Sequence, residues 1–144
     1  MARKYGAPFE VEAAKAKFFE IYMAKYCRPG AGIGFPGAAA LVAACRAAGL
    51  RTAVASSADR VKVDANLAAA EIPQTLFDAV VTADAFERLK PFPDIFLAAA
   101  AQLGADPANC VVIEDAEAGV QAARAAGRPG MGAGRRAGVA GGSR

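Results

Sequence analysis

Cysteine is scarce in this 144-residue chain: its three cysteines, Cys27, Cys45 and Cys110, are odd in number and widely spaced. This pattern excludes a disulfide framework or a zinc cluster and indicates small core residues in a reducing compartment. No apolar run is long enough to span a bilayer, and Met1 is not followed by a signal-peptide pattern. With 55% hydrophobic and 22% charged residues, the chain has the composition of one soluble domain.

A surplus of one charge sign is also lacking over most of the chain. The formal net charge is +3, but the segment from Arg128 onward holds four arginines and no acidic residue. The preceding residues carry 13 basic and 14 acidic side chains, a net charge of −1. This balance argues against nucleic acid as a partner. Residues 128–144 are rich in Gly, Ala and Arg and have no periodic apolar face, which predicts a disordered tail.

Apolar residues alternate between helical spacing and short continuous runs. Helical spacing predicts helices at Phe9–Tyr26, Ala38–Ala48, Ala58–Ala70, Pro93–Leu103 and Ala116–Ala126. Short apolar runs predict strands at Leu50–Ala55, Phe77–Thr82 and Cys110–Ile113. Strands that alternate with helices are typical of parallel βαβ units, and continuously apolar strands are expected where helices cover both faces of a sheet. The predicted fold class is therefore α/β, a Rossmann-like three-layer parallel sheet with helices on both faces.

Polar residues follow each predicted strand. Ser56 and Ser57 follow the first strand. Asp84 and later Lys90 follow the second, and Glu114 and Asp115 follow the third. The carboxyl ends of parallel strands meet at one edge of a sheet, so these side chains are expected to lie close together. Hydroxyl and N–H groups bind phosphate oxygens, lysine neutralises phosphate charge, and carboxylates hold Mg²⁺. The pattern predicts phosphoryl chemistry.

Each of these residues also has a simpler structural interpretation. Ser56, Ser57 or Asp115 could cap the helix that follows it, since Ser and Asp are preferred at helix N-termini. Lys90 could be a solvated loop lysine. Asp94 is expected to be a cap or the partner of another side chain rather than a metal ligand. Three separate loops with phosphate-compatible groups nevertheless favour the functional interpretation.

Three segments resemble the second, third and fourth motifs of the haloacid dehalogenase-like hydrolases, in order and at familiar spacing: residues 54–57, 89–96 and 112–120. The β-phosphoglucomutase-like branch is the most similar, and Phe35-Pro36-Gly37 resembles the turn that precedes the second motif there. Residues 53–67 also resemble the hydrolase-like domain of a multidomain plant chloroplast protein. That resemblance implies the chloroplast stroma as the location, and a cytoplasmic location is the alternative. The resemblance covers roughly Phe9 to Gly127.

The resemblance implies specific roles for the predicted site residues. Ser56 would bind the transferring phosphoryl group with help from the N–H of Ser57, and Lys90 would stabilise phosphate and nucleophile. Ser56 and Lys90 are therefore the expected catalytic residues. Glu114 and Asp115 would hold Mg²⁺ directly or through water. In such enzymes an aspartate attacks the phosphorus of a small phosphorylated substrate and forms an aspartyl-phosphate.

The expected nucleophile motif is absent, because no Asp-x-Asp occurs anywhere in the sequence. By the same resemblance, residues 1–34 are a partial helical cap and residues 35–127 an incomplete core. The first core strand, which in this family lies between the second and fourth motif strands, and the last core strand are expected to be missing. The resemblance thus implies truncation at both ends.

Two functions are compatible with this sequence. The first is a fragment of a Mg²⁺-dependent phosphatase or phosphomutase, inactive alone, whose complete parent protein acts on small phosphorylated metabolites. The second is a non-catalytic binding or regulatory module of a larger chloroplast protein with further domains.

Overall fold

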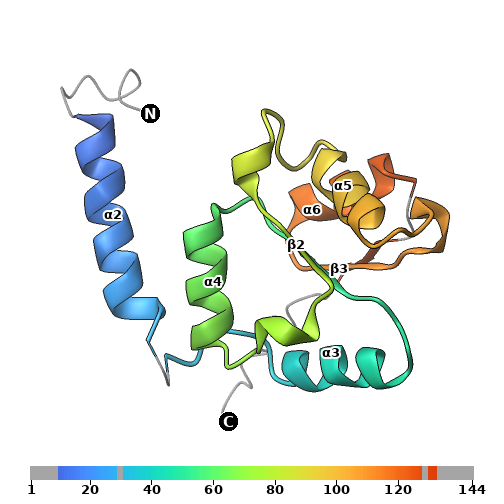
Figure 1. Cartoon of the computed structure of the whole chain (residues 1–144). Helices are drawn as coiled ribbons and strands as arrows, with labels where there is room; N and C mark the ends of the chain where they lie inside the picture. The colour runs from blue at the N-terminus through green and yellow to red at the C-terminus, as the bar shows by residue number, and fades with distance from the viewer. Residues whose placement is uncertain (1–9, 29–30, 128–129, 133–144) are drawn as a thin grey trace, which may run out of the picture. The chain divides into compact units, whose positions relative to one another are not determined.

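The computed structural model describes residues 10–28, 31–127 and 130–132 of the chain (Figure 1). The chain divides into two compact units, Met1–Leu50 with Val61–Leu76 and Arg51–Arg60 with Phe77–Arg144. None of the helices in the described part of the chain combines the length and apolarity needed to cross a bilayer. The domain boundaries expected from the sequence at residues 34 and 127 remain predictions.

The first unit is helical. Its elements are α2 (Val11–Tyr26), α3 (Ala38–Ala47), α4 (Arg60–Ala69, whose first residue belongs to the second unit) and the 3₁₀ helix η1 (Gln74–Leu76). No residue of α2 is buried. The Tyr22 ring stacks on Phe18 with centroids 5.9 Å apart, and its hydroxyl donates to Asn66 Oδ1 of α4 at 2.8 Å. Lys62 of α4 also lies over the Phe18 and Tyr22 rings, so polar and cation–ring contacts, rather than a core, connect α2 to α4.

The second unit contains all the strands of the described chain. They are β1 (Ala53–Ala55), β2 (Ala79–Val81), β3 (Val112–Glu114) and β4 (Gly130–Gly132). The helices are α5 (Asp94–Gln102) and α6 (Glu117–Ala125), with short 3₁₀ helices η2 (Ala83–Ala85) and η3 (Pro107–Asn109). The strands form two parallel pairs, with Val54 opposite Val80 and Ile113 opposite Met131. This arrangement confirms the predicted parallel α/β class.

The core of the second unit forms where α5 packs on β1 and β2. Ile95 is fully buried and lies with Val81 and Ala99, with Phe86 and Phe96 packed against them. Burying an isoleucine side chain of this size stabilises a fold by about 2 kcal/mol. α6 packs on β3 and β4, and α5 contacts α6 (Figure 1). The two helices therefore connect the two strand pairs.

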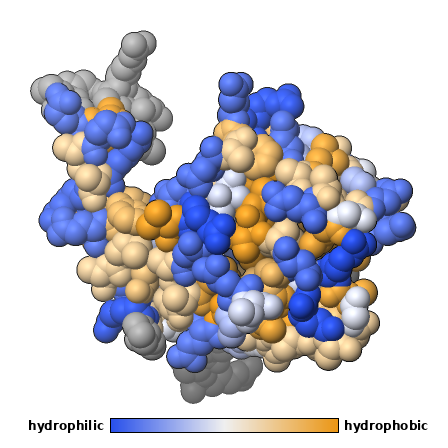
Figure 2. Space-filling model, viewed as in Figure 1, coloured by the Kyte–Doolittle hydropathy of each residue, from blue (hydrophilic) through white to orange (hydrophobic). Residues whose placement is uncertain are grey.

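The strands of the two pairs are not hydrogen-bonded into one sheet. Among the described residues, β1 pairs with β2 and β3 pairs with β4, and no strand joins β1 to β3. Ile113, in the middle of β3, is 57% exposed, whereas a strand inside a helix-covered parallel sheet is normally buried. Figure 2 shows that hydrophobic residues remain visible at the surface between hydrophilic ones. Among the described residues, β1 and β3 thus each have an edge without a partner strand, and the missing first core strand remains a prediction.

One expectation about the end of the chain needs correction. The sequence predicts no convincing strand after Gly127, but Gly130–Gly132 form β4 beside β3. A parallel ladder uses backbone N–H and C=O groups, so glycines that give no apolar signal can still form it. The disorder expected for residues 128–144 otherwise concerns segments outside the described residues.

The other predicted elements are present with shorter boundaries. Each predicted strand shrinks to three residues, because only these have a partner strand opposite them. α4 begins two residues later than expected, since Ala58 belongs to a turn closed by Ser56. The expected start of the first helix at Phe9 lies outside the described residues.

Candidate active site at the carboxyl ends of the strands

The loop after β1 presents two serines in different settings. The Ser56 N–H donates to Val81 O at 3.0 Å, and its Oγ accepts from the Ala58 N–H at 3.1 Å. Ser56 thus closes a local turn, as the simpler interpretation expected. Ser57 is exposed, and its Oγ accepts from the Lys90 N–H at 3.4 Å. The structure therefore places the serine loop directly beside Lys90.

Lys90 is not a solvated loop lysine. Its side chain is only 14% exposed, and Nζ donates to Ala55 O at 3.0 Å and to Glu114 Oε2 at 2.6 Å. The ammonium group also lies 4.8 Å from the centre of the Phe96 ring. Since Ala55 ends β1 and Glu114 ends β3, one cation connects the carboxyl ends of the two separate strand pairs.

Glu114 is held from both sides of its carboxylate. Oε2 accepts from Lys90, and Oε1 accepts from the N–H groups of Asp115 at 3.2 Å and Ala116 at 3.1 Å. Burial raises the pKa of Glu114, but the hydrogen bonds from Lys90 and the backbone outweigh it, and the pKa lies below its usual value. Glu114 is therefore a fixed anion that neutralises Lys90.

The position of Glu114 depends on a glycine that sequence reasoning did not single out. Gly119 is buried in α6, and a Cβ added there would overlap the Glu114 carboxyl group. Only hydrogen at this position lets Glu114 lie against the helix. The sequence spacing could have identified Gly119, because a residue one helical turn beyond Glu114 and Asp115 faces back toward them.

Asp115 has a different environment from its neighbour. It is exposed, and the N-cap of α6 is Ala116 without a side-chain cap, so the capping interpretation of Asp115 does not hold. No ion pair of its carboxylate occurs among the described residues. Asp94 pairs with Arg88 at 2.8 Å, as expected for the partner of another side chain.

The two acids fit Mg²⁺ only in a limited way. Mg²⁺ is commonly bound by one or two protein carboxylates, with waters and substrate phosphate completing its shell. Asp115 offers an open carboxylate, whereas both oxygens of Glu114 already accept hydrogen bonds. No cluster of three potential ligands occurs in the described part of the chain. Asp115 would be the direct ligand and Glu114 an indirect one through water.

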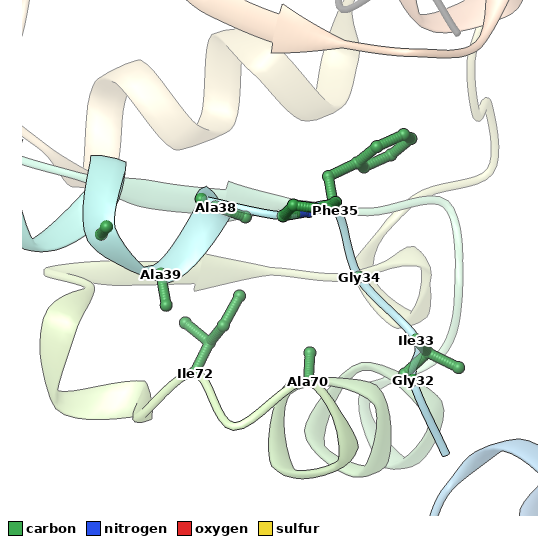
Figure 3. Close-up of a pocket in the computed structure, with 11 residues that line it drawn as sticks. Gly32, Ile33, Gly34, Phe35, Ala38, Ala39, Ala70 and Ile72 are labelled. Atoms are coloured by element: carbon green, nitrogen blue, oxygen red, sulfur yellow. The ribbon is translucent and has the colours of Figure 1, made fainter. Parts of the chain in front are cut away.

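The first unit contains a cavity of about 420 Å³ that carries none of this chemistry (Figure 3). The loop at residues 32–37, the first turn of α3, Ala70 and Ile72 line it. All its lining side chains are apolar or absent. The predicted site residues instead lie within the second unit: Ser56, Ser57, Lys90, Glu114 and Asp115. Their roles remain predictions.

Comparisons with known proteins agree on one family. A family model described as haloacid dehalogenase-like hydrolase matches residues 3–127. Protein SUPPRESSOR OF QUENCHING 1, chloroplastic, from Arabidopsis thaliana is 66% identical over 118 residues, which cover 82% of this chain and 11% of that protein. The chain therefore spans about a ninth of this relative's length.

Solved structures give the same picture. A β-phosphoglucomutase from Clostridium difficile matches with a TM-score of 0.74 and 27% identity, over 90% of this chain and 57% of that one. A mutant of CbbY from Rhodobacter sphaeroides, solved in complex with xylulose-(1,5)bisphosphate, matches with a TM-score of 0.73 and 29% identity over 90% of this chain and 58% of that one.

Proposed function

The chain belongs to the haloacid dehalogenase-like hydrolases, and from that premise we propose that it supplies the phosphate- and Mg²⁺-binding part of a phosphatase or phosphomutase. The substrate class is small phosphorylated metabolites. The names of a phosphoglucomutase and of a protein solved with a sugar bisphosphate support this class. The observation that carries the proposal is the position of the Lys90 ammonium between Ala55 O and the Glu114 carboxylate.

The chemistry assigned to each residue follows from its environment. The Ser56 hydroxyl and the Ser57 N–H bind phosphate oxygens, and Lys90 neutralises charge on the transferring group. Asp115 holds Mg²⁺, with Glu114 as the counter-ion of Lys90 and a water-mediated contact. The bound Mg²⁺ supplies charge neutralisation at the phosphoryl group.

The chain alone is expected to bind but not to turn over. An aspartyl-phosphate requires an aspartate at the end of a strand beside Lys90, and the sequence has no Asp-x-Asp. Within the part of the chain that the structure describes, β1 and β3 each have an edge without a partner strand, and these edges support a position for the nucleophile strand. The nucleophile is therefore proposed to come from outside these 144 residues.

Calorimetric titration of the chain with inorganic phosphate tests this proposal. We expect binding that depends on Mg²⁺, a loss of about tenfold or more in Lys90→Ala, and no change in Lys17→Ala, which removes an exposed surface lysine. Phosphate binding that is equal in Lys90→Ala and the unsubstituted chain would contradict the site.

A turnover assay tests the inactivity separately. With Mg²⁺ and an aryl phosphate, the chain is expected to release phosphate no faster than the blank. Turnover that disappears in Lys90→Ala or Asp115→Ala would show that another nucleophile acts, while the phosphoryl-transfer assignment would stand.

A second function is favoured by the match to the suppressor-of-quenching protein, of which this chain covers only 11%. In that case the chain is a binding or regulatory module of a larger chloroplast protein, and chloroplast location follows from the same relative. The two functions differ in a simple test. Addition of the missing strand restores turnover only if the chain is part of an enzyme.

A further inference from the structure

Asp84 lies near the site but has no part in the chemistry described so far. It belongs to η2, directly after β2, and its side chain is exposed. Its Oδ2 accepts from Thr82 Oγ1 at 2.8 Å and from the Arg60 N–H at 2.8 Å. Thr82 is the one polar residue of the described chain whose side chain is buried, with 9% exposure. The Asp84 carboxylate is therefore oriented by a fixed hydroxyl.

The Arg60 N–H begins α4, immediately after the serine loop. We define the phosphate loop as residues 56–60. Its first residue is held by the hydrogen bond from Ser56 N–H to Val81 O, and its middle by the bond from Ala83 N–H to Ala58 O at 2.9 Å. Asp84 holds its last residue. Asp84 is thus a side chain from outside the loop that accepts from the loop's last residue, in addition to the loop's backbone bonds and the bonds to Ser56 Oγ and Ser57 Oγ.

The charge of Asp84 suits this position. A helix N-terminus carries partial positive charge and exposed N–H groups, which attract anions. The Arg60 N–H is already occupied by a carboxylate and the Ser56 N–H by Val81 O, so the Ser56 hydroxyl and the Ser57 N–H are the donors assigned here to phosphate. The hydrogen bond from Thr82, followed by that from the Arg60 N–H, lowers the pKa of Asp84, so the carboxylate stays ionised at neutral pH.

We propose that Asp84 is a positioning residue that fixes the phosphate loop for phosphate binding by Ser56 and Ser57. This inference rests on the proposed function of the loop. Asp84 is not itself proposed to bind phosphate or metal. It acts through its hydrogen bonds with the Arg60 N–H and Thr82. The position of the serines therefore depends on Asp84, whereas the position of the acids after β3 does not.

The experiment measures phosphate and Mg²⁺ affinity in the full chain. Asp84→Ala is expected to weaken inorganic phosphate binding about tenfold and to leave Mg²⁺ binding unchanged. Asp84→Asn is expected to stay within about threefold, because its amide oxygen accepts the same two hydrogen bonds. Asp106→Ala is the matched control: Asp106 is also exposed and accepts from the Ala108 N–H in another loop of the second unit.

Two outcomes would overturn the proposal. Asp84→Ala could bind phosphate as the unsubstituted chain does, or it could lose phosphate and Mg²⁺ affinity in parallel, as a general loss of folding would cause. A chain that binds no phosphate at all contradicts the proposed function instead. Amide exchange then decides the positioning role: residues 57–60 should exchange about tenfold faster in Asp84→Ala but not in Asp106→Ala, and equal exchange would refute it.

Discussion

The Lys90 ammonium contacts the end of β1, the end of β3 and the ring of Phe96 on α5. Three elements of the second unit therefore depend on one side chain. A buried ion pair contributes little net stability, but removal of one partner leaves the other uncompensated. A substitution of either residue should consequently change the environment of both Lys90 and Glu114.

Gly119→Ala is expected to disturb the site although Gly119 bears no functional group. The added Cβ would overlap the Glu114 carboxyl and move it away from Lys90. The pKa of Glu114 should then rise toward its usual value, which carboxyl NMR titration measures. The urea midpoint should fall, even though alanine for glycine within a helix normally stabilises by about 1 kcal/mol. Gln121→Ala, on the exposed side of α6, should leave both unchanged.

Thr82→Val is expected to raise the pKa of Asp84, since it removes the hydrogen bond that lowers this pKa most. A carboxyl whose native pKa is lowered stabilises the fold at pH values above its unfolded pKa. This stabilisation is lost as the pH falls from the unfolded pKa through the native pKa. In both chains this loss begins near the unfolded value, so the substituted chain should lose less stability on acidification, and its loss should end at a higher pH. Urea unfolding between about pH 5 and pH 2, with the carboxyl titration, measures the difference. Identical profiles would mean that Thr82 does not set this pKa.

Among the residues, the sequence predicted that the loops after the three strands meet but not how their side chains are bonded. The positions after three strands identified Ser56, Lys90 and Glu114, because parallel strands end at one edge. The Thr82–Asp84–Arg60 connection depends on loop conformation, which apolar periodicity does not encode. Glu114 looked like a metal ligand equal to Asp115, and only its two-sided hydrogen bonding distinguishes it.

Among the elements, α2 and α5 both carry large apolar residues at helical spacing but have opposite environments. Ile95 of α5 is fully buried, whereas Ile21 of α2 is 53% exposed. Ile95→Ala should lower the free energy of unfolding by about 3 kcal/mol, since it leaves a cavity in the core of the second unit. Ile21→Ala should cost well under about 1 kcal/mol. Urea titration compares them, and equal costs would show that α2 is covered in solution.

Helical elements were predicted more accurately than strands, for a physical reason. A helix satisfies its backbone within itself, so its spacing is visible along the sequence. A strand is defined by its partner, and β4 has glycine at two of three positions. β4 forms because β3 offers it a partner edge, and that edge exists only once the chain has folded.

At the scale of the whole molecule, the gap between β1 and β3 can be tested directly. An apolar peptide of roughly ten residues ending in Asp-x-Asp is expected to bind there and raise the urea midpoint, because each strand edge gains a partner. With Mg²⁺ and an aryl phosphate, turnover should begin. The same peptide with Asn in place of the first Asp should stabilise without turnover. A peptide with a central proline should do neither.

The outcome separates the two functions. Stabilisation without turnover by the Asp-x-Asp peptide would favour the binding module, while turnover would favour the enzyme. No effect on stability would mean that the edges of β1 and β3 are closed to a strand in solution.

The edge of β3 also predicts that self-association of the chain depends on protein concentration. Among the described residues, one edge of β3 has no partner strand and Ile113 is exposed, and such an edge is a template for pairing with another copy of the chain. Dilute and concentrated samples of this protein should therefore differ in particle size. Its apparent melting temperature should also depend on the protein concentration of the sample.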